Sequence, residues 1–297
     1  MHLSNHNIQL VRSTFAQCYN ALINIIQRHP VDIEVRGNAL VYELILPRLV
    51  FDVPCVSVYS SPISRATPIR FCLAEFLWII SGSDELAMIN RFNGRMSMFS
   101  DDKAKLYGAY GLRLGDQIHH AIEKIRSDKY SRQAYCDIHR ADDIAAKSKD
   151  IPCNTALQFI VRNDRLYMTV ISRSSDFVTG MSIDAVHWQI LYHCVLNSIR
   201  KYHPLITWGT ITYQLTSLHV YRNDLDAIST WVTDERLHNY DHTITIRDDY
   251  YSMSNKSLND FPMCETLADM LVLYNLSFHE RNTLQDIAKY KNQLAQR

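Results

Sequence analysis

A strand pair followed by a long apolar helix, between residues 155 and 202, is the feature that most restricts the fold of this chain. The segment TALQFIVRNDRLYMTVIS has two runs rich in β-branched and aromatic residues on either side of Asn163-Asp164, a pair that favours turns. It predicts an antiparallel hairpin. The next segment, IDAVHWQILYHCVLNSIRKY, is apolar enough to predict a long buried helix. Strands covered by such a helix are typical of an α+β fold.

The segments before this hairpin alternate between helical and extended patterns. Apolar residues at helical spacing predict a helix over residues 7–28 and a buried helix over residues 67–82, where Gly82 is a stop signal. Residues 39–59 are rich in strand-forming residues and are interrupted by two prolines, so they predict several short strands.

The segments after the long helix continue the same mixture. TITYQLTSLHVYRND, residues 210–224, alternates like a strand, which places His219 and Tyr221 on one face. The chain from residue 264 onward predicts two helices joined near Ser277. The fold class we expect is therefore α+β, with a predominantly antiparallel or mixed sheet and packed helices.

Composition limits the class of protein. The chain has 297 residues, of which 47% are hydrophobic, and its eight glycines and eight prolines form no linker, so we expect a single domain over residues 1–297. Lys+Arg and Asp+Glu are both 31, and this balance argues against binding to polymeric nucleic acid. No apolar run is long enough to predict a membrane span.

The cysteine and histidine patterns exclude two further classes. Seven cysteines without a CxxC pair argue against a disulfide framework. With no signal peptide visible at the start, they indicate a reducing, cytoplasmic setting, which would be the host cytoplasm for a phage-encoded protein. None of the thirteen histidines falls in a metal-binding spacing such as HExxH, so we expect no metal site.

Four residues are candidates for chemistry, although each has an ordinary structural interpretation. Cys153 follows Pro152 ahead of a strand, and a random cysteine is usually a small buried hydrophobe. Arg173, at the end of the next strand, would favour the nucleophilic thiolate if it lay close by. Glu75 lies in CLAEFLWII, where a carboxylate is costly without partners or a task. His219 alone is more often a satisfied core histidine.

Taken in order, these residues resemble one family. The shared motifs are Arg36-Gly37, Glu75 in EFLW, Tyr110-Gly111, Cys153 in IPC, Arg173 in SRSSD, and His219 in HVY. Together they resemble the thymidylate synthase family from about residue 10 to about residue 226. The resemblance implies a thymidylate synthase-like fold, a pyrimidine nucleoside monophosphate as substrate and 5,10-methylenetetrahydrofolate as co-substrate. The segment from about 227 to 297 is not covered clearly.

The resemblance implies a role for each matching residue in the reaction. Cys153 would add to C6 of the pyrimidine, which makes C5 a nucleophile toward the one-carbon unit of the folate. Glu75 matches the carboxylate that organises water and proton transfers around the base. Tyr110 matches the active-site tyrosine, with Tyr107 as an alternative in YGAYG.

The phosphate and the partner subunit are implied in the same way. Arg36, Arg173 and Ser174 match phosphate-binding positions, and the guanidinium fork suits that task. Arg132 matches an arginine that the family donates across a homodimer interface. Gln133 stands where the family often has a second arginine, so one phosphate contact is weakened or replaced.

The sugar and the folate are implied to meet the remaining matches. His219 and Tyr221 match residues that hold the sugar 3′-hydroxyl. Asp176 and Gly180 match residues near the folate and the pyrimidine. Where the synthase places a tryptophan against the folate, MSMFSDD offers Phe99 or Met98.

Asp184 departs from the pattern of thymidylate synthase, which has an asparagine there to pair with uracil. An ionised aspartate only accepts hydrogen bonds, so it suits the 4-amino group of cytosine and not O4 of uracil. The other carboxylate oxygen would then face N3 of cytosine, which is also an acceptor, so the two atoms need a shared proton. This aspartate resembles that of the deoxycytidylate hydroxymethylases in the family. The plain alternative is that Asp184 merely begins the helix, where acidic residues are favoured.

The resulting hypothesis is a deoxycytidylate 5-hydroxymethyltransferase, in which water attacks the exocyclic methylene of the base. The missing tryptophan and the polar end KNQLAQR favour this water route over reduction. The alternatives are a deoxycytidylate methylase, a cytidylate hydroxymethylase and an ordinary thymidylate synthase acting on deoxyuridylate. A non-catalytic nucleotide- or RNA-binding member of the fold is the alternative from another class.

Overall fold

A computed structural model of the chain describes residues 8–28, 32–35, 39–54, 56–59, 67–232 and 241–244. Arg36 and the segment from residue 264 onward lie outside these residues. Contacts divide the chain into two compact units, each assembled from segments far apart in sequence. Unit 1 comprises Met1–Thr67, Cys153–Ile190 and Ile206–Ile246, and unit 2 comprises Pro68–Pro152, Leu191–Leu205 and Arg247–Arg297. Whether the whole chain forms one domain stays a prediction.

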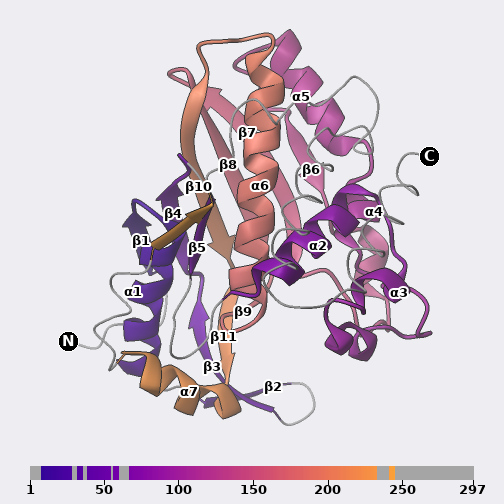
Figure 1. The fold of residues 1–297 in the computed structure, drawn as a ribbon, viewed down its shortest axis with the longest axis vertical. Coiled ribbons are helices and arrows are strands. Elements are labelled where there is room, and N and C mark those ends of the chain that lie inside the picture. The colour runs from indigo at the N-terminus through magenta and orange to yellow at the C-terminus, as the bar shows by residue number, and fades with distance from the viewer. Residues whose placement is uncertain are drawn as a thin grey trace, which may run out of the picture. The chain divides into compact units, whose positions relative to one another are not determined.

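Unit 1 is built mainly from strands (Figure 1). Its elements are β1 (Gln9–Arg12), α1 (Phe15–Arg28), β2 (Asp32–Val35), β3 (Ala39–Ile45), β4 (Arg48–Asp52), β5 (Val56–Tyr59), β7 (Asn154–Arg162), β8 (Arg165–Ser172), β9 (Ser175–Asp176), β10 (Thr207–Leu215), β11 (Ser217–Tyr221), α7 (Arg222–Val232) and β12 (Asp241–Ile244). The helix α6 (Gly180–Arg200) begins in this unit.

The strands of unit 1 form mixed sheets, as the α+β pattern predicts. One sheet has the order β1-β4-β10-β8-β7 within the unit, with β1-β4 and β10-β8 parallel and the other pairs antiparallel. A second has the order β2-β3-β11-β9, and β5 pairs with β12. The prolines at 47 and 54 fall between β3, β4 and β5, which confirms the predicted breaks.

The predicted hairpin is confirmed as β7 and β8, which pair antiparallel from Leu157↔Val170 to Arg162↔Arg165. Asn163 and Asp164 have φ of 49° and 56°. Two successive positive φ values belong to the type I′ turn, whose twist matches that of the two strands, and Asn and Asp tolerate them.

The prediction of one helix over residues 7–28 is wrong in its first part. Gln9–Arg12 form β1, which pairs in parallel with Arg48–Phe51, and the helix begins only at Phe15. Thr14 marks the boundary, because its hydroxyl accepts a hydrogen bond from the backbone N–H of Gln17. Pairing with a distant strand has overridden the local helical period.

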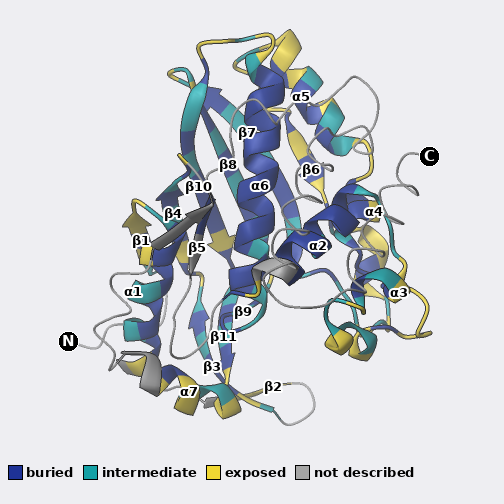
Figure 2. Cartoon of the chain, in the orientation of Figure 1, coloured by how far each residue is buried: buried dark blue, intermediate teal, exposed yellow. Residues whose placement is uncertain are grey.

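The long helix α6 is buried along most of its length, as its apolar sequence predicts (Figure 2). Within unit 1 it is tied to β5 by a reciprocal amide contact. The Gln189 side chain accepts from the Ser57 backbone N–H at 2.8 Å and donates to the Ser57 carbonyl at 3.0 Å. Gln189 is fully buried, so these bonds satisfy a polar group that is costly to leave unpaired.

Unit 2 is mainly helical, and its elements are α2 (Ile69–Ile80), α3 (Leu86–Ile89), η1 (Gly94–Met98), α4 (Tyr110–Leu114), α5 (Gln117–Ser127), β6 (Tyr135–Asp137) and η2 (Ala141–Ile144). The helix α2 ends just before Gly82, which has φ 68° and confirms the predicted stop. In the described part of the chain, no helix combines the length and the apolar character needed to cross a membrane.

Candidate active site

The candidate nucleophile in unit 1 is held beside an arginine by backbone geometry. Cys153 immediately precedes β7, and its carbonyl accepts from the Arg173 backbone N–H and from the Ser172 hydroxyl, both at 3.0 Å. The guanidinium of Arg173 lies 3.8 Å from the Cys153 sulfur. Cys153 is half-buried and Arg173 is exposed. A cation at this place favours a thiolate, so the predicted proximity is present.

The predicted sugar-binding pair lies on β11. The rings of His219 and Tyr221 are 5.3 Å apart and nearly perpendicular, which confirms their common strand face. The Ser174 hydroxyl is 3.5 Å from Nδ1 of His219, and the Ser172 hydroxyl binds the Ser174 carbonyl at 2.8 Å. Arg173, Ser174 and His219 are therefore brought together with Cys153.

The imidazole of His219 is neutral in this setting. Burial lowers the pKa of His219, and the charge of Arg173 lowers it further, against the raising effects of Asp176 and Glu43. Because the ordinary value is 6.5, the ring is a neutral donor and acceptor at pH 7. A neutral imidazole suits a hydroxyl partner better than an anionic one.

The positions predicted near the folate, Asp176 and Gly180, lie where β9 leads into α6. The Asp176 carboxylate accepts from the Val178 backbone N–H at 2.9 Å, which fixes its orientation. A Cβ added at Gly180 would meet only the Cβ of Asp176, at 3.9 Å. The structure thus places the two residues at one junction, and their role toward the folate stays a prediction.

Asp184 does not begin the helix, which corrects the plain alternative given above. The helix α6 starts at Gly180, and its first turn contains no acidic residue, so Asp184 lies one turn further in. Its Oδ2 accepts a hydrogen bond of 2.8 Å from Nδ2 of Asn154, the residue after Cys153. Burial raises the pKa of Asp184 to about 7, although the Asn154 bond lowers it. This carboxyl therefore titrates near neutral pH.

Tyr213, on β10, is the second group near Asp184. Burial raises the pKa of Tyr213 well above 10, and the charge of Asp184 raises it further, so the phenol keeps its proton. Its hydroxyl is fully buried and has no hydrogen-bond partner among the described residues. Asn154 and Tyr213 belong to none of the sequence motifs, because both become relevant only through their contact or proximity to Asp184.

In unit 2, Glu75 and Tyr110 lie on two helices in direct contact, α2 and α4. A Cβ at Gly111 would lie 1.9 Å from the Ile79 carbonyl oxygen, so only glycine allows this approach. Ile79 shares a helix face with Glu75, four residues earlier, and Gly111 follows Tyr110. Both Glu75 and Tyr110 are half-buried in otherwise buried surroundings.

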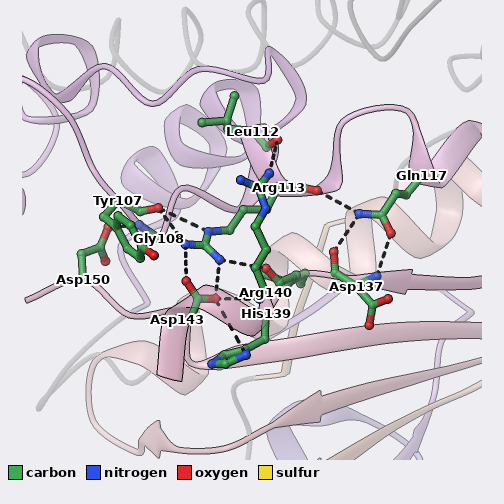
Figure 3. A network of polar contacts seen from close by, with 11 residues as sticks. Tyr107, Gly108, Leu112, Arg113, Gln117, Asp137, His139, Arg140, Asp143 and Asp150 are labelled. Atoms are coloured by element: carbon green, nitrogen blue, oxygen red, sulfur yellow. Dashed lines mark hydrogen bonds and ion pairs between the residues drawn. The ribbon is translucent and has the colours of Figure 1, made fainter. Parts of the chain in front are cut away.

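Tyr107, the alternative to Tyr110, belongs to a different cluster of unit 2 (Figure 3). Its hydroxyl is hydrogen-bonded to Asp143, and its carbonyl accepts from Arg113 at 3.0 Å. The guanidinium of Arg113 also lies 5.0 Å from the Tyr107 ring centroid. These contacts show that Tyr107 is part of this cluster, and the choice of Tyr110 over Tyr107 stays a prediction.

The centre of that cluster is a buried ion pair that the sequence did not reveal. Arg113 donates to both oxygens of Asp143, at 2.6 and 2.9 Å, and the Arg140 backbone N–H donates at 2.7 Å. Although burial raises the pKa of Asp143, the hydrogen bonds from Arg113, Arg140 and Tyr107 lower it well below its usual range. The Arg113 side chain is buried and makes two hydrogen bonds to one carboxylate, so its role is to stabilise the fold.

The two other predicted positions of unit 2 are exposed. Phe99 follows η1 with 47% of its surface exposed, and Arg132 lies in the loop between α5 and β6. Gln133 accepts from the Lys124 ammonium at 3.2 Å, so its side chain is engaged within the chain.

Comparison with known proteins identifies the family of this chain. The family model described as thymidylate synthase matches residues 18–267. The chain is 30% identical over 199 residues to the deoxyuridylate hydroxymethyltransferase of Pseudomonas phage M6, covering 62% of this chain and 55% of the relative. It is 30% identical over 203 residues to the enzyme of that name in Bacillus phage SP01, covering 59% and 51%. The thymidylate synthase of Symbiobacterium thermophilum is 25% identical over 182 residues, covering 54% and 62%.

The chain belongs to the thymidylate synthase family. This confirms the predicted fold and the resemblance drawn from the motifs, and members of the family bind a pyrimidine nucleotide and use methylenetetrahydrofolate as co-substrate. The chain spans about half the length of the phage hydroxymethyltransferases that it matches.

Proposed function

We propose that this protein transfers a hydroxymethyl group from methylenetetrahydrofolate to C5 of deoxycytidylate. The observation that supports this substrate is the carboxyl of Asp184, whose pKa is about 7. When ionised, it offers no hydrogen to O4 of uracil but accepts from the 4-amino group of cytosine. When protonated, it can share its proton with N3 of cytosine, where negative charge develops as the ring is attacked.

The chemical step starts at the sulfur of Cys153. With Arg173 at 3.8 Å stabilising the thiolate, the sulfur adds to C6 and leaves C5 nucleophilic. C5 then bonds to the one-carbon unit of the folate and loses its proton, and tetrahydrofolate leaves, so that an exocyclic methylene remains at C5. Water adds to this methylene, and the Cys153 sulfur is eliminated from C6, which restores the ring double bond and frees the thiolate. The family resemblance assigns Glu75 and Tyr110 to the water and the proton transfers.

The rest of the nucleotide is held by polar groups close to Cys153. The exposed guanidinium of Arg173 and the hydroxyl of Ser174 bind the phosphate. The motif match assigns Arg36 to the phosphate as well, and this residue lies outside the described part of the chain. The neutral imidazole of His219 and the hydroxyl of Tyr221 bind the sugar hydroxyl. These contacts fix the ring, so that base selection depends on the edge that faces Asp184.

We further propose a homodimer in which each Arg132 reaches the phosphate of its partner's site. Its exposure is compatible with this role. One face of the larger sheet of unit 1 also carries half-exposed apolar side chains, namely Val50, Ile160, Tyr167 and Ile171. A second copy would bury this face. Mixing inactive Cys153→Ala and Arg132→Ala proteins restores activity only if the sites are shared.

Hydroxymethylation of deoxyuridylate is the second candidate, favoured by the names of the two phage relatives. A protonated Asp184 could also donate to O4 of uracil. Reductive methylation and use of the ribonucleotide are the remaining alternatives for product and substrate.

Release of tritium from C5 tests the proposal, because exchange requires the Cys153 adduct whatever follows. Deoxycytidylate and deoxyuridylate labelled at C5 are each supplied with methylenetetrahydrofolate. We expect faster release from deoxycytidylate, none from Cys153→Ala protein, and a product heavier than the methylated base by one oxygen. Faster release from deoxyuridylate would favour the second candidate, and dihydrofolate formation would indicate methylation.

A further inference from the structure

We propose that Asn154 is a positioning residue that decides which oxygen of Asp184 remains an acceptor, and thereby which pyrimidine the site selects. This inference rests on the proposed function, since it concerns base selection in the same reaction. It assigns a role to a side chain that the motifs passed over, although it is adjacent to the nucleophile.

The contact between Asn154 and Asp184 is a buried hydrogen bond that starts from a strand. Asn154 is 1% exposed and begins β7, directly after Cys153. Its Nδ2 donates to Oδ2 of Asp184 at 2.8 Å. It pairs with Ser172 across the sheet, and the register shifts between Asn154 and Ala156. An irregularity of this kind re-aims a side chain, and here the amide meets the first half of α6.

A carboxyl group in its neutral form cannot by itself choose between the two bases. Its protonated form has one donor and one acceptor, which match N3 and the 4-amino group of cytosine in one orientation. With the two oxygens exchanged, the same group matches O4 and N3–H of uracil. Selection therefore requires something that makes the two oxygens of Asp184 different.

The Asn154 amide makes them different. Because Nδ2 already donates to Oδ2, that oxygen stays an acceptor, and the proton of the neutral acid resides on Oδ1. We assign Oδ2 to the 4-amino group of cytosine and Oδ1 to its N3. For uracil, the same proton arrangement would require the ring or the carboxyl to turn, against the contacts to the sugar and phosphate.

The other group near Asp184 does not perform this task. Tyr213 is close enough for charges to interact, but its hydroxyl makes no hydrogen bond within the described part of the chain. It is a neutral phenol and leaves the two carboxyl oxygens alike. Among the described residues, Asn154 is thus the donor that makes the two oxygens of Asp184 different.

The test compares Asn154→Ala and the nearly isosteric Asn154→Leu with Asn197→Ala, a control on the same helix as Asp184. Asn197 is also buried, and its amide nitrogen has no hydrogen-bond partner among the described residues. The measured quantity is the ratio of kcat/KM for deoxycytidylate to that for deoxyuridylate. We expect both Asn154 variants to lower this ratio about tenfold, as for loss of one hydrogen bond that orients a charged group. The control leaves the ratio unchanged.

A second readout does not depend on turnover. Infrared titration of the Asp184 carboxyl, assigned by its loss in Asp184→Asn, should show a higher pKa in both Asn154 variants, because the lost bond favours the ionised form. If both substrates decline equally and the pKa of Asp184 stays the same, Asn154 is only structural and the inference is wrong. If the wild type prefers deoxyuridylate but the Asn154 variants change that preference tenfold, the proposed substrate fails while the role of Asn154 is supported.

Discussion

Two carboxyl groups, one in each unit, show opposite behaviour. Asp143 in unit 2 receives two hydrogen bonds from Arg113, one from the Arg140 backbone and one from Tyr107, and its pKa is well below the usual range. Asp184 in unit 1 receives one neutral amide hydrogen bond, and its pKa is raised to about 7. The number and charge of the hydrogen-bond donors thus decide whether the rise in pKa caused by burial is offset.

The comparison separates a structural carboxylate from one suited to chemistry. Asp143 stays charged near neutral pH, so it can hold a fold but does not exchange a proton there. Asp184 changes its protonation near neutral pH, and perturbed groups of this kind are enriched at functional sites. Asp184, whose few hydrogen bonds do not offset the effect of burial on its pKa, is therefore the carboxyl that points to function.

The largest effect we expect comes from replacing the carboxyl of Asp184 by an amide. Asp184→Asn would give the site a permanent donor for O4 of uracil, and the 4-amino group of cytosine would then meet that donor. We expect the ratio of kcat/KM for deoxycytidylate to that for deoxyuridylate to fall about 10⁴-fold, as in sites built around one hydrogen bond. Steady-state kinetics with both nucleotides measures it. An unchanged ratio would remove Asp184 from base selection.

Removing the ion pair between Arg113 and Asp143 in unit 2 should lower the stability of the protein. Arg113→Ala leaves Asp143 buried and without its counter-ion, so we expect the free energy of unfolding to fall by about 3–5 kcal/mol. Urea unfolding measures the change. The matched control is Arg126→Ala, which removes an exposed pair with Glu123 at 3.0 Å and should cost about 0.5 kcal/mol or less. Equal losses in the two variants would contradict the structural role of the Arg113 cluster.

The smallest effect is a pH dependence of stability. The pKa of Asp184 is 3.8 in its ordinary state and about 7 in the fold. As the pH rises from 4 to 7, the unfolded chain loses this proton while the folded chain keeps it, so stability falls, and it levels off above pH 7. Because Asp184 is only half-buried, solvent screening reduces this contribution, and we expect the free energy of unfolding to fall by about 2 kcal/mol over this range.

Urea unfolding of the wild type and of Asp184→Asn across that pH range isolates this contribution, because the other groups titrate alike in both proteins. The stability of the wild type relative to the variant should decline from pH 4 to 7. A constant difference between the two proteins would show that the pKa of Asp184 is not raised by the fold. Asp143 contributes with the opposite sign, since its stabilisation is lost when acid protonates it.

The sequence alone determined those features that depend on neighbouring residues. The turn at Asn163-Asp164, the strand breaks at the prolines and the end of α2 before Gly82 follow from backbone preferences of single residues. The motif around Cys153 and Arg173 identified the family correctly. The same local reasoning failed at residues 9–12, because a helical period says nothing about a parallel partner strand 39 residues away.

Only the tertiary structure decided which acidic residue is poised to titrate. Asn154 and Asp184 are 30 residues apart, and so are Arg113 and Asp143. The pKa of a carboxyl depends on its burial and on donors supplied by remote segments, and neither is encoded in the residues beside it. The sequence named an aspartate where an asparagine was expected, and the fold gave that aspartate a single neutral donor and a proton to exchange.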